Sequence, residues 1–233
     1  RYVEALDRRY GPSETVVVFL FKALAANYEA IRPMCESFAV NRPLTTGLIQ
    51  WMLNSAWPET YWQLFDWYLM PNGAFYGTRA ASQPLNLSFN YADETVYAVN
   101  DSRFEGEGLT AVVRAFDLSA QEIYNQSYEI DLPAAGAQPV VSFAGQKAPT
   151  PVWFLDLQLR DGSGAEVARN FYWLSTTRSS IKKARVSAEL LSCTVTSDPL
   201  PDADTSSSTS GRSSRAVKSA NSLVGVTNQR LFS

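Results

Sequence analysis

The segment 46–69, TGLIQWMLNSAWPETYWQLFDWYL, concentrates tryptophan and side-chain amides within two dozen residues. Tryptophan is usually either buried in a hydrophobic core or presented as a flat platform against which a ligand can stack. An amide beside such a platform could exchange hydrogen bonds with a polar ligand, or it could pin the backbone of its own loop. The residue types leave both interpretations open. The tryptophans of this segment are Trp51, Trp57, Trp62 and Trp67.

The chain of 233 residues contains no histidine. Ser-His-Asp triads, Cys-His dyads and histidine metal sites are therefore excluded, and any chemistry must use carboxylates, lysine, tyrosine or cysteine. The two cysteines, Cys35 and Cys193, are far apart in the sequence. A disulfide between them is possible but not favoured, and their spacing does not suggest zinc. We expect neither a metal nor a cofactor.

Composition argues against a nucleic-acid-binding or membrane-spanning protein. The formal net charge is −3, and there is no run of about 20 apolar residues that could cross a bilayer. The opening residues Arg1–Ala5 resemble neither a signal peptide nor a start with an initiator methionine, so we expect the chain to belong to a longer protein. Three Asn-x-Ser triplets, at Asn86, Asn100 and Asn125, are compatible with a secreted glycoprotein. The expected localisation is therefore extracellular or in the secretory pathway.

Residues 1–81 have the pattern of an α/β fold. Apolar residues recur at helical spacing over Thr15–Phe38 and predict a helix. Gly47–Leu53 is a short apolar run bounded by turn-forming residues, which predicts a buried parallel strand. Pro58–Leu69 fits a second helix that a Pro-Asn-Gly turn would end. Because one strand cannot form a sheet, we expect the partner strands of this segment to lie elsewhere.

Residues 82–175 have a different pattern, in which short runs of alternating apolar residues are separated by turn signals. Seven such runs in about ninety residues predict an immunoglobulin-like β-sandwich. The Arg-Asp-Gly-Ser-Gly-Ala-Glu sequence at 160–166 predicts a hairpin connection. The predicted strands are Leu85–Tyr91, Thr95–Asn100, Leu109–Leu118, Glu122–Leu132, Pro139–Gly145, Val152–Arg160 and Glu166–Leu174.

Residues 176–233 form a low-complexity tail that is rich in serine, threonine and basic residues. This composition predicts disorder. The basic residues could be read as a targeting or polyanion-binding patch, but a solvated tail without such a function is the favoured interpretation.

Three stretches carry a resemblance to glycoside hydrolase family 2 that covers about residues 1–175. They are KALAANYEAIRPMCESF, TTGLIQWMLNSAWPETYWQLFDWYLMPNGAFYGTRAASQPL and YWLS. Within the family the chain is more similar to exo-β-D-glucosaminidases than to β-mannosidases. The positions that match the family pattern are Thr46, Gly47, Ile49, Trp51, Asn54, Trp57, Trp62, Asp66, Tyr68 and Leu69.

The resemblance implies α/β plus all-β architecture: the terminal part of a (β/α)8 TIM barrel, then an immunoglobulin-like β-sandwich and the disordered tail. Residues 1–81 would be the last part of the barrel, with Gly47–Leu53 as its eighth strand between two helices. Residues 82–175 would be the first sandwich after it. The sites of such barrels lie at the carboxyl ends of the strands.

This placement implies substrate-binding roles for Trp51, Asn54 and Trp57, with indole faces against the sugar ring and an amide against its hydroxyls. The alternative is that Trp51 packs inside the barrel and Asn54 pins the loop. For Trp62 and Trp67, packing in the core or against the sandwich is the favoured interpretation. Asp66 is expected in mid-helix, with a structural hydrogen bond or in solvent.

No catalytic residue is assigned in this chain. The family uses two glutamates, at the ends of the fourth and seventh barrel strands, and both strands would precede Arg1. Glu29 and Glu36 share a helical face, for which a solvated or salt-bridged surface is the default. The chain alone is therefore expected to be inactive, although the resemblance makes its parent protein a hydrolase of O-glycosidic bonds.

Two hypotheses follow. In the first, the chain is a carboxyl-terminal fragment of a retaining exo-glycosidase that acts on β-linked glucosamine, as in chitosan oligosaccharides, or alternatively on β-mannosides. Its expected partner is the oligosaccharide substrate held by the complete barrel, with no nucleic acid and no membrane span. In the second, the sandwich is a non-catalytic module that binds carbohydrate or a protein partner. The sequence does not specify an oligomeric state.

Overall fold

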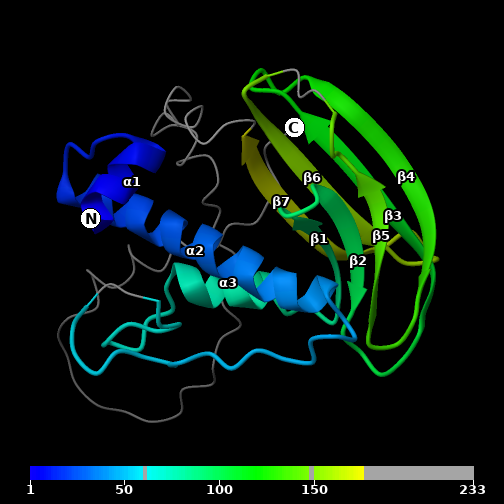
Figure 1. Cartoon of the computed structure of the whole chain (residues 1–233), viewed down its shortest axis with the longest axis horizontal. Helices are drawn as coiled ribbons and strands as arrows, with labels where there is room; N and C mark the ends of the chain where they lie inside the picture. Colours follow the sequence, from blue (N-terminus) through cyan, green and yellow to red (C-terminus); the bar gives the residue numbers. More distant parts are fainter. Residues whose placement is uncertain (60–61, 147–149, 176–233) are drawn as a thin grey trace, which may run out of the picture. The chain divides into compact units, whose positions relative to one another are not determined.

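The computed structural model of the chain describes residues 1–59, 62–146 and 150–175. They lie within a compact unit, Arg1–Ala184, and the predicted tail at 176–233 falls outside the described residues. In the described part, three helices precede seven strands (Figure 1). The helices are α1 (Tyr2–Tyr10), α2 (Val16–Val40) and α3 (Gly73–Ala81). The strands are β1 (Leu85–Asn90), β2 (Thr95–Asn100), β3 (Gly106–Phe116), β4 (Glu122–Leu132), β5 (Gly136–Ser142), β6 (Val152–Arg160) and β7 (Glu166–Ser175).

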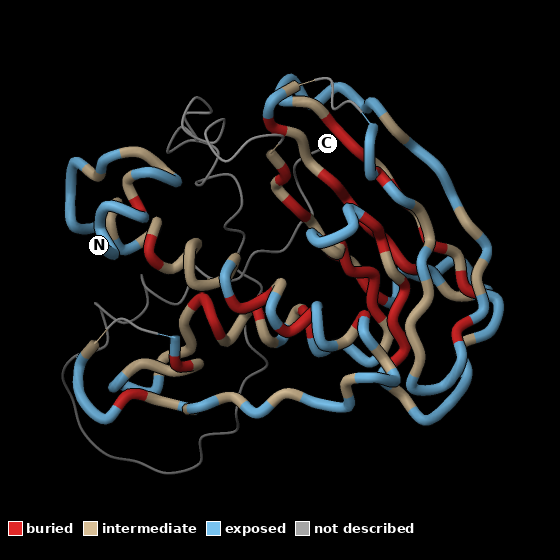
Figure 2. The backbone as a smooth tube through the Cα atoms, in the orientation of Figure 1, coloured by how far each residue is buried: buried red, intermediate tan, exposed pale blue. Residues whose placement is uncertain are grey.

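The strands form two antiparallel sheets with the orders β1-β2-β5 and β4-β3-β6-β7. The predicted β-sandwich is thereby confirmed, and β2, β4 and β6 have the predicted bounds. Burial alternates along β3, where Leu109, Ala111 and Val113 are buried and the residues between them are less so. This alternation is that of a strand with one face on a core, and Figure 2 shows the buried stretches along the strands.

The β6–β7 hairpin shows how local sequence sets the register of the second sheet. Asp161 Oδ1 accepts hydrogen bonds from the backbone N–H of Ser163 at 2.9 Å and of Ala165 at 3.1 Å. Gly164 has a φ of 85°, a conformation that side chains other than glycine rarely adopt. The predicted hairpin is confirmed, and an aspartate at its start with a glycine at its end accounts for it.

Helix α2 begins at a threonine cap and packs closely against α3. Thr15 Oγ1 accepts a hydrogen bond from Val18 N at 3.2 Å, which satisfies one of the free N–H groups of the first turn. A Cβ at Gly73 would lie 2.1 Å from Leu24 O, so the two helices approach as closely as they do because this residue is glycine. Among the described residues, no helix is both long enough and apolar enough to cross a membrane.

A buried polar cluster joins α2 to the sandwich. Tyr172 Oη donates a hydrogen bond to Glu36 Oε1 at 2.7 Å, and Asn170 Nδ2 lies 3.4 Å from the same oxygen. Arg32 Nη1 donates to Phe171 O at 2.7 Å, and the guanidinium carbon lies 4.0 Å from the centre of the Tyr172 ring. Arg32 Nε is 3.7 Å from Glu36 Oε1, so the two side chains also form an ion pair.

The expectation of a solvated or salt-bridged surface for Glu29 and Glu36 holds for one of them. Glu29 forms an ion pair with Arg9 and accepts a hydrogen bond from Tyr10 Oη at 2.9 Å. Glu36 is only 2% exposed, so the prediction is wrong for this residue. The reason is that this part of α2 faces β7 rather than solvent. Burial raises the pKa of Glu36, while Arg32 acts in the opposite direction.

Two further predictions for residues 1–81 are wrong for the chain as it stands. Gly47–Leu53 forms no strand, and the described part of Pro58–Leu69 forms no helix. A strand requires a neighbouring strand for its backbone hydrogen bonds, and among the described residues none lies beside 47–53. The Asn72 side chain accepts hydrogen bonds from Ala74 N and Phe75 N, so the predicted end of a helix is instead the start of α3.

Candidate functional site

The loop between α2 and α3, residues 41–72, carries all three residues predicted to contact a substrate. Near its middle it folds back on itself, because Leu53 O accepts hydrogen bonds from Leu64 N and Phe65 N, each at 3.0 Å. Asn54 and Phe65 form an isolated parallel bridge beside these contacts. The tryptophan-rich segment is therefore a structured loop, held by local hydrogen bonds rather than by a sheet.

A tight turn around Asp66 closes the second half of the loop. Asp66 Oδ1 accepts hydrogen bonds from Tyr68 N at 2.8 Å and Met70 N at 2.9 Å, and Asp66 N donates to Met70 O at 3.0 Å. Leu69, within this turn, has a φ of 60°. The structural hydrogen bond expected of Asp66 is present, although in a turn and not in a helix. This carboxylate is committed to the backbone.

Apolar contacts attach the loop to the helices. Leu48 and Leu64 pack against a small cluster of buried residues, and the rings of Phe65 and Phe75 lie 5.1 Å apart between centroids. The cluster consists of Ile31, Cys35, Ala74 and Ala81, which come from α2 and α3. The loop is thus anchored at a few points, and its exposed residues lie between them together with the buried Ser55 and Gln63.

Trp51 and Trp57 are exposed, at 78% and 62% of their surface. The backbone oxygen of Trp51 accepts a hydrogen bond from Trp62 Nε1 at 2.7 Å, and Asn54 Nδ2 donates to Ser55 O at 3.1 Å. The structure places the three predicted residues on one loop. Within the described part of the chain, the contacts found link Trp51 to Trp62 rather than to Asn54 or Trp57.

Trp62 and Trp67, for which packing in the core or against the sandwich was favoured, are 40% and 47% exposed. That prediction is wrong for this chain, because the helix that was to bury them is not formed. The loop therefore presents indole surface at four positions. An exposed indole face can stack on the C–H face of a ring-shaped ligand and can also serve as a docking surface.

The carboxyl groups described in this loop do not form a catalytic pair. Glu59 Oε1 accepts a hydrogen bond from Gln63 Nε2 at 3.1 Å, and Asp66 is held in its turn. Hydrolysis by a carboxyl pair requires two such groups that face one substrate, and in the described loop Glu59 and Asp66 are each held by other partners.

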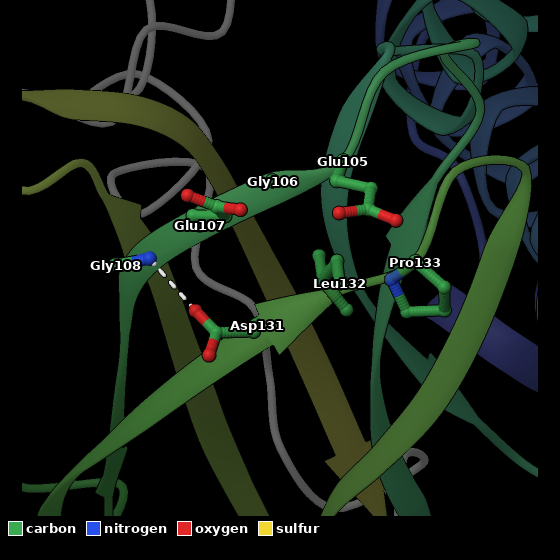
Figure 3. Close-up of a pocket in the computed structure, with 7 residues that line it drawn as sticks. All are labelled: Glu105, Gly106, Glu107, Gly108, Asp131, Leu132 and Pro133. Atoms are coloured by element: carbon green, nitrogen blue, oxygen red, sulfur yellow. Dashed lines mark hydrogen bonds between the residues drawn. The ribbon is translucent and has the colours of Figure 1, made fainter.

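A concave feature, which the sequence did not indicate, lies where β3 begins and β4 ends (Figure 3). Its volume is about 540 Å³, and Glu105, Glu107 and Asp131 contribute carboxylates to its lining. Asp131 Oδ1 accepts a hydrogen bond from Gly108 N at 2.8 Å. The polar side chains of the lining are carboxylates, and in the described residues no group of three or more potential ligands could hold a metal ion.

Residues 94–178 match the family model described as "Mannosidase Ig/CBM-like domain", which covers most of the sandwich. The chain is similar to an exo-beta-D-glucosaminidase of Amycolatopsis orientalis, with 37% identity over 180 residues, 74% of this chain and 17% of the relative. A mannosylglycoprotein endo-beta-mannosidase of Lilium longiflorum is 28% identical over 171 residues, 71% of this chain and 18% of the relative.

The crystal structure of an Amycolatopsis orientalis exo-chitosanase superposes with a TM-score of 0.71 and 36% identity, over 76% of this chain and 22% of that one. The expected resemblance to exo-β-D-glucosaminidases, with a mannosidase as a further relative, is therefore confirmed. The chain spans about a fifth of the length of the curated relatives that it matches.

Proposed function

We propose that this chain is part of a retaining exo-glycosidase of glycoside hydrolase family 2 that hydrolyses β-linked glucosamine, as in chitosan oligosaccharides. The observation that carries the proposal is an exposed loop that presents Trp51, Asn54 and Trp57, in a chain similar to exo-beta-D-glucosaminidases. Hydrolysis with retention requires two carboxyl groups about 5–5.5 Å apart. Both catalytic glutamates are proposed to lie outside this chain.

In the proposed enzyme, the tryptophan loop completes the mouth of a (β/α)8 barrel. Ile49 is 95% exposed and Leu53 is 59% exposed, although both are apolar. Such exposure fits a segment that packs against parts of a larger protein, where neighbouring strands would supply hydrogen bonds to residues 47–53. The indoles of Trp51 and Trp57 would then line the entrance, and Asn54 would contact sugar hydroxyls.

A chimera tests this function. The segment of the Amycolatopsis orientalis enzyme that matches this chain is replaced by residues 1–175, and hydrolysis of p-nitrophenyl β-D-glucosaminide and chitosan oligomers is measured. We expect turnover by the chimera and none by the isolated chain. A folded chimera that does not act on either substrate would argue against the proposal, as would hydrolysis by the isolated chain.

The β-mannosidase alternative is favoured by two observations: the family model matched by 94–178 and the similarity to an endo-beta-mannosidase. Assay of the same chimera on p-nitrophenyl β-D-mannoside distinguishes the two sugars. The sandwich could also act as a non-catalytic binding module for carbohydrate or a partner, in which case chitosan oligomers would bind the isolated chain without being cleaved. We place the protein outside the cell or in the secretory pathway, and fractionation of the source organism tests this placement.

A further inference from the structure

Two of the three Asn-x-Ser triplets place their asparagine inside the fold. Asn86 is 2% exposed, and its Nδ2 donates to Ala80 O at 3.0 Å while its Oδ1 accepts from Asn170 Nδ2 at 3.0 Å. Asn100 is 0% exposed, and its Nδ2 donates to Phe104 O at 2.8 Å. A sugar on either nitrogen would have to occupy space that is already filled by protein and would remove buried hydrogen bonds.

The third triplet lies on the outer surface of the sandwich. Asn125 and Ser127 are both exposed and lie two positions apart in β4, so their side chains leave the same face of the strand. Tyr124 directly precedes the triplet and Tyr128 directly follows it, and both side chains pack against the core. The strand therefore directs the acceptor asparagine and its serine together toward solvent.

The position of β4 adds room around this triplet. In the sheet order β4-β3-β6-β7, β4 is an edge strand that pairs with β3 alone (Figure 1). The side-chain contact found for Asn125 is a hydrogen bond from Nδ2 to Glu122 Oε1 at 2.9 Å, which is exposed. A glycosylated amide keeps one N–H, so this contact can survive modification. A glycan here would also shield a free sheet edge from pairing with another chain.

We propose that Asn125 is an N-glycosylation site and that Asn86 and Asn100 are not. In the reaction, Asn125 Nδ2 attacks the anomeric carbon of an oligosaccharide carried on a polyprenyl diphosphate. The new C–N bond forms as the C–O bond to the diphosphate breaks, the amide proton passes to a base of the transferase, and the lipid diphosphate leaves. The proposal rests on the proposed secretory localisation and not on the proposed hydrolase activity.

Secretion of the whole chain behind an added signal peptide in yeast tests the site separately from the natural localisation. The secreted protein is treated with peptide N-glycosidase F in ¹⁸O water, and the three triplets are mapped by mass spectrometry. We expect the label at Asn125 and at neither of the other two asparagines. S127A and N125Q should each abolish the mobility shift caused by the enzyme, while the matched control S127T, which preserves the triplet, should retain it.

Secreted protein with an unmodified Asn125 would overturn the proposal. It would also be overturned by a glycan on Asn86 or Asn100 in protein that is soluble and has the circular dichroism of a folded sandwich. Because the signal peptide and the host supply entry to the compartment, neither result would bear on where the natural protein resides.

Discussion

Tyr172 of β7 donates its hydroxyl proton to Glu36 Oε1 of α2 at 2.7 Å, across 136 residues of sequence. The same hydroxyl oxygen accepts a hydrogen bond from Phe89 N at 3.1 Å. One side chain therefore links a helix, a strand of the first sheet and a strand of the second. The tyrosine ring is fully buried in the sandwich core, and burial raises the pKa of Tyr172 well above its ordinary value, so the hydroxyl stays protonated and able to donate.

Removal of this hydroxyl should destabilise the folded chain. Y172F keeps the ring in the core but leaves a buried N–H and a buried carboxylate each without one partner. The expected loss in the free energy of unfolding is about 1–3 kcal/mol, measured by denaturation with urea. Y97F is the matched control, because Tyr97 Oη donates to Asp93 Oδ2 at 2.8 Å on the surface. Equal effects of the two substitutions would contradict the importance of the buried contact.

Arg32 should matter more than other ion-paired arginines of this chain. Arg32 and Glu36 are both buried, so R32M would leave the Glu36 carboxylate inside the protein without its positive partner. We expect a loss of about 3–5 kcal/mol in the free energy of unfolding. R9M breaks the pair with Glu29, which is more exposed, and should cost no more than about 1 kcal/mol. Thermal and urea unfolding of both variants compare the two pairs. An R32M variant as stable as R9M would mean that the buried pair contributes no more than a surface one.

The sandwich could be predicted from the sequence because short runs of alternating apolar residues mark its strands, as in Leu85-x-Leu87-x-Phe89, where Leu87 and Phe89 are buried in the core. The buried cluster around Glu36 could not, since spacing on a helix identifies a face but not what that face contacts. Asn86 illustrates the same limit. It lies between Leu85 and Leu87, on the opposite face of the strand, and only the fold shows that α3 and β7 bury it there through Ala80 and Asn170.

The loop at 41–72 was predicted less well for a different reason. An apolar run such as 47–53 reports that a segment is suited to burial, but whether it becomes a strand depends on neighbours that the run itself does not contain. Trp51 and Trp57 of this loop lie in solvent. Their substrate remains a prediction.

G73A should force α3 away from α2. A methyl group at this position would overlap Leu24 O, at 2.1 Å, and Tyr28 N, at 2.9 Å, and both are backbone atoms that cannot rotate aside. The expected destabilisation is about 1–3 kcal/mol or more, read from urea unfolding. G47A is the control, because nothing lies within 4 Å of a Cβ built there. If G73A and G47A unfolded at the same urea concentration, the close approach of the helices would be refuted.

Asp161 should make stability depend on acid pH. The Ser163 hydroxyl, which donates to Asp161 Oδ1 at 2.6 Å, lowers the pKa of this carboxyl below its ordinary 3.8. Since the folded state then binds the proton more weakly than the unfolded state, the contribution is present above pH 3.8 and is lost as pH falls through the lower, folded value. The difference in unfolding free energy between wild type and D161N should therefore shrink on acidification.

S163A provides the matched comparison, because it removes the hydrogen bond from the Ser163 hydroxyl that lowers the pKa of Asp161 but keeps the carboxyl itself. Its pH dependence should be weaker than that of the wild type and should extend less far into acid. A difference between wild type and D161N that stays constant from neutral pH to pH 2 would contradict the assignment.

Trp57 should affect substrate binding in the active chimera without affecting its fold. If its exposed indole stacks on a sugar ring, W57A loses about 0.5–1.5 kcal/mol, which is roughly a twofold to tenfold fall in kcat/KM for chitosan oligomers. W67A is the control: Trp67 lies on the same loop, is 47% exposed and is not predicted to contact substrate, so kcat/KM should hold within about twofold. Equal losses from the two substitutions, with unchanged circular dichroism, would point to a general role of the loop surface rather than to a sugar platform at Trp57.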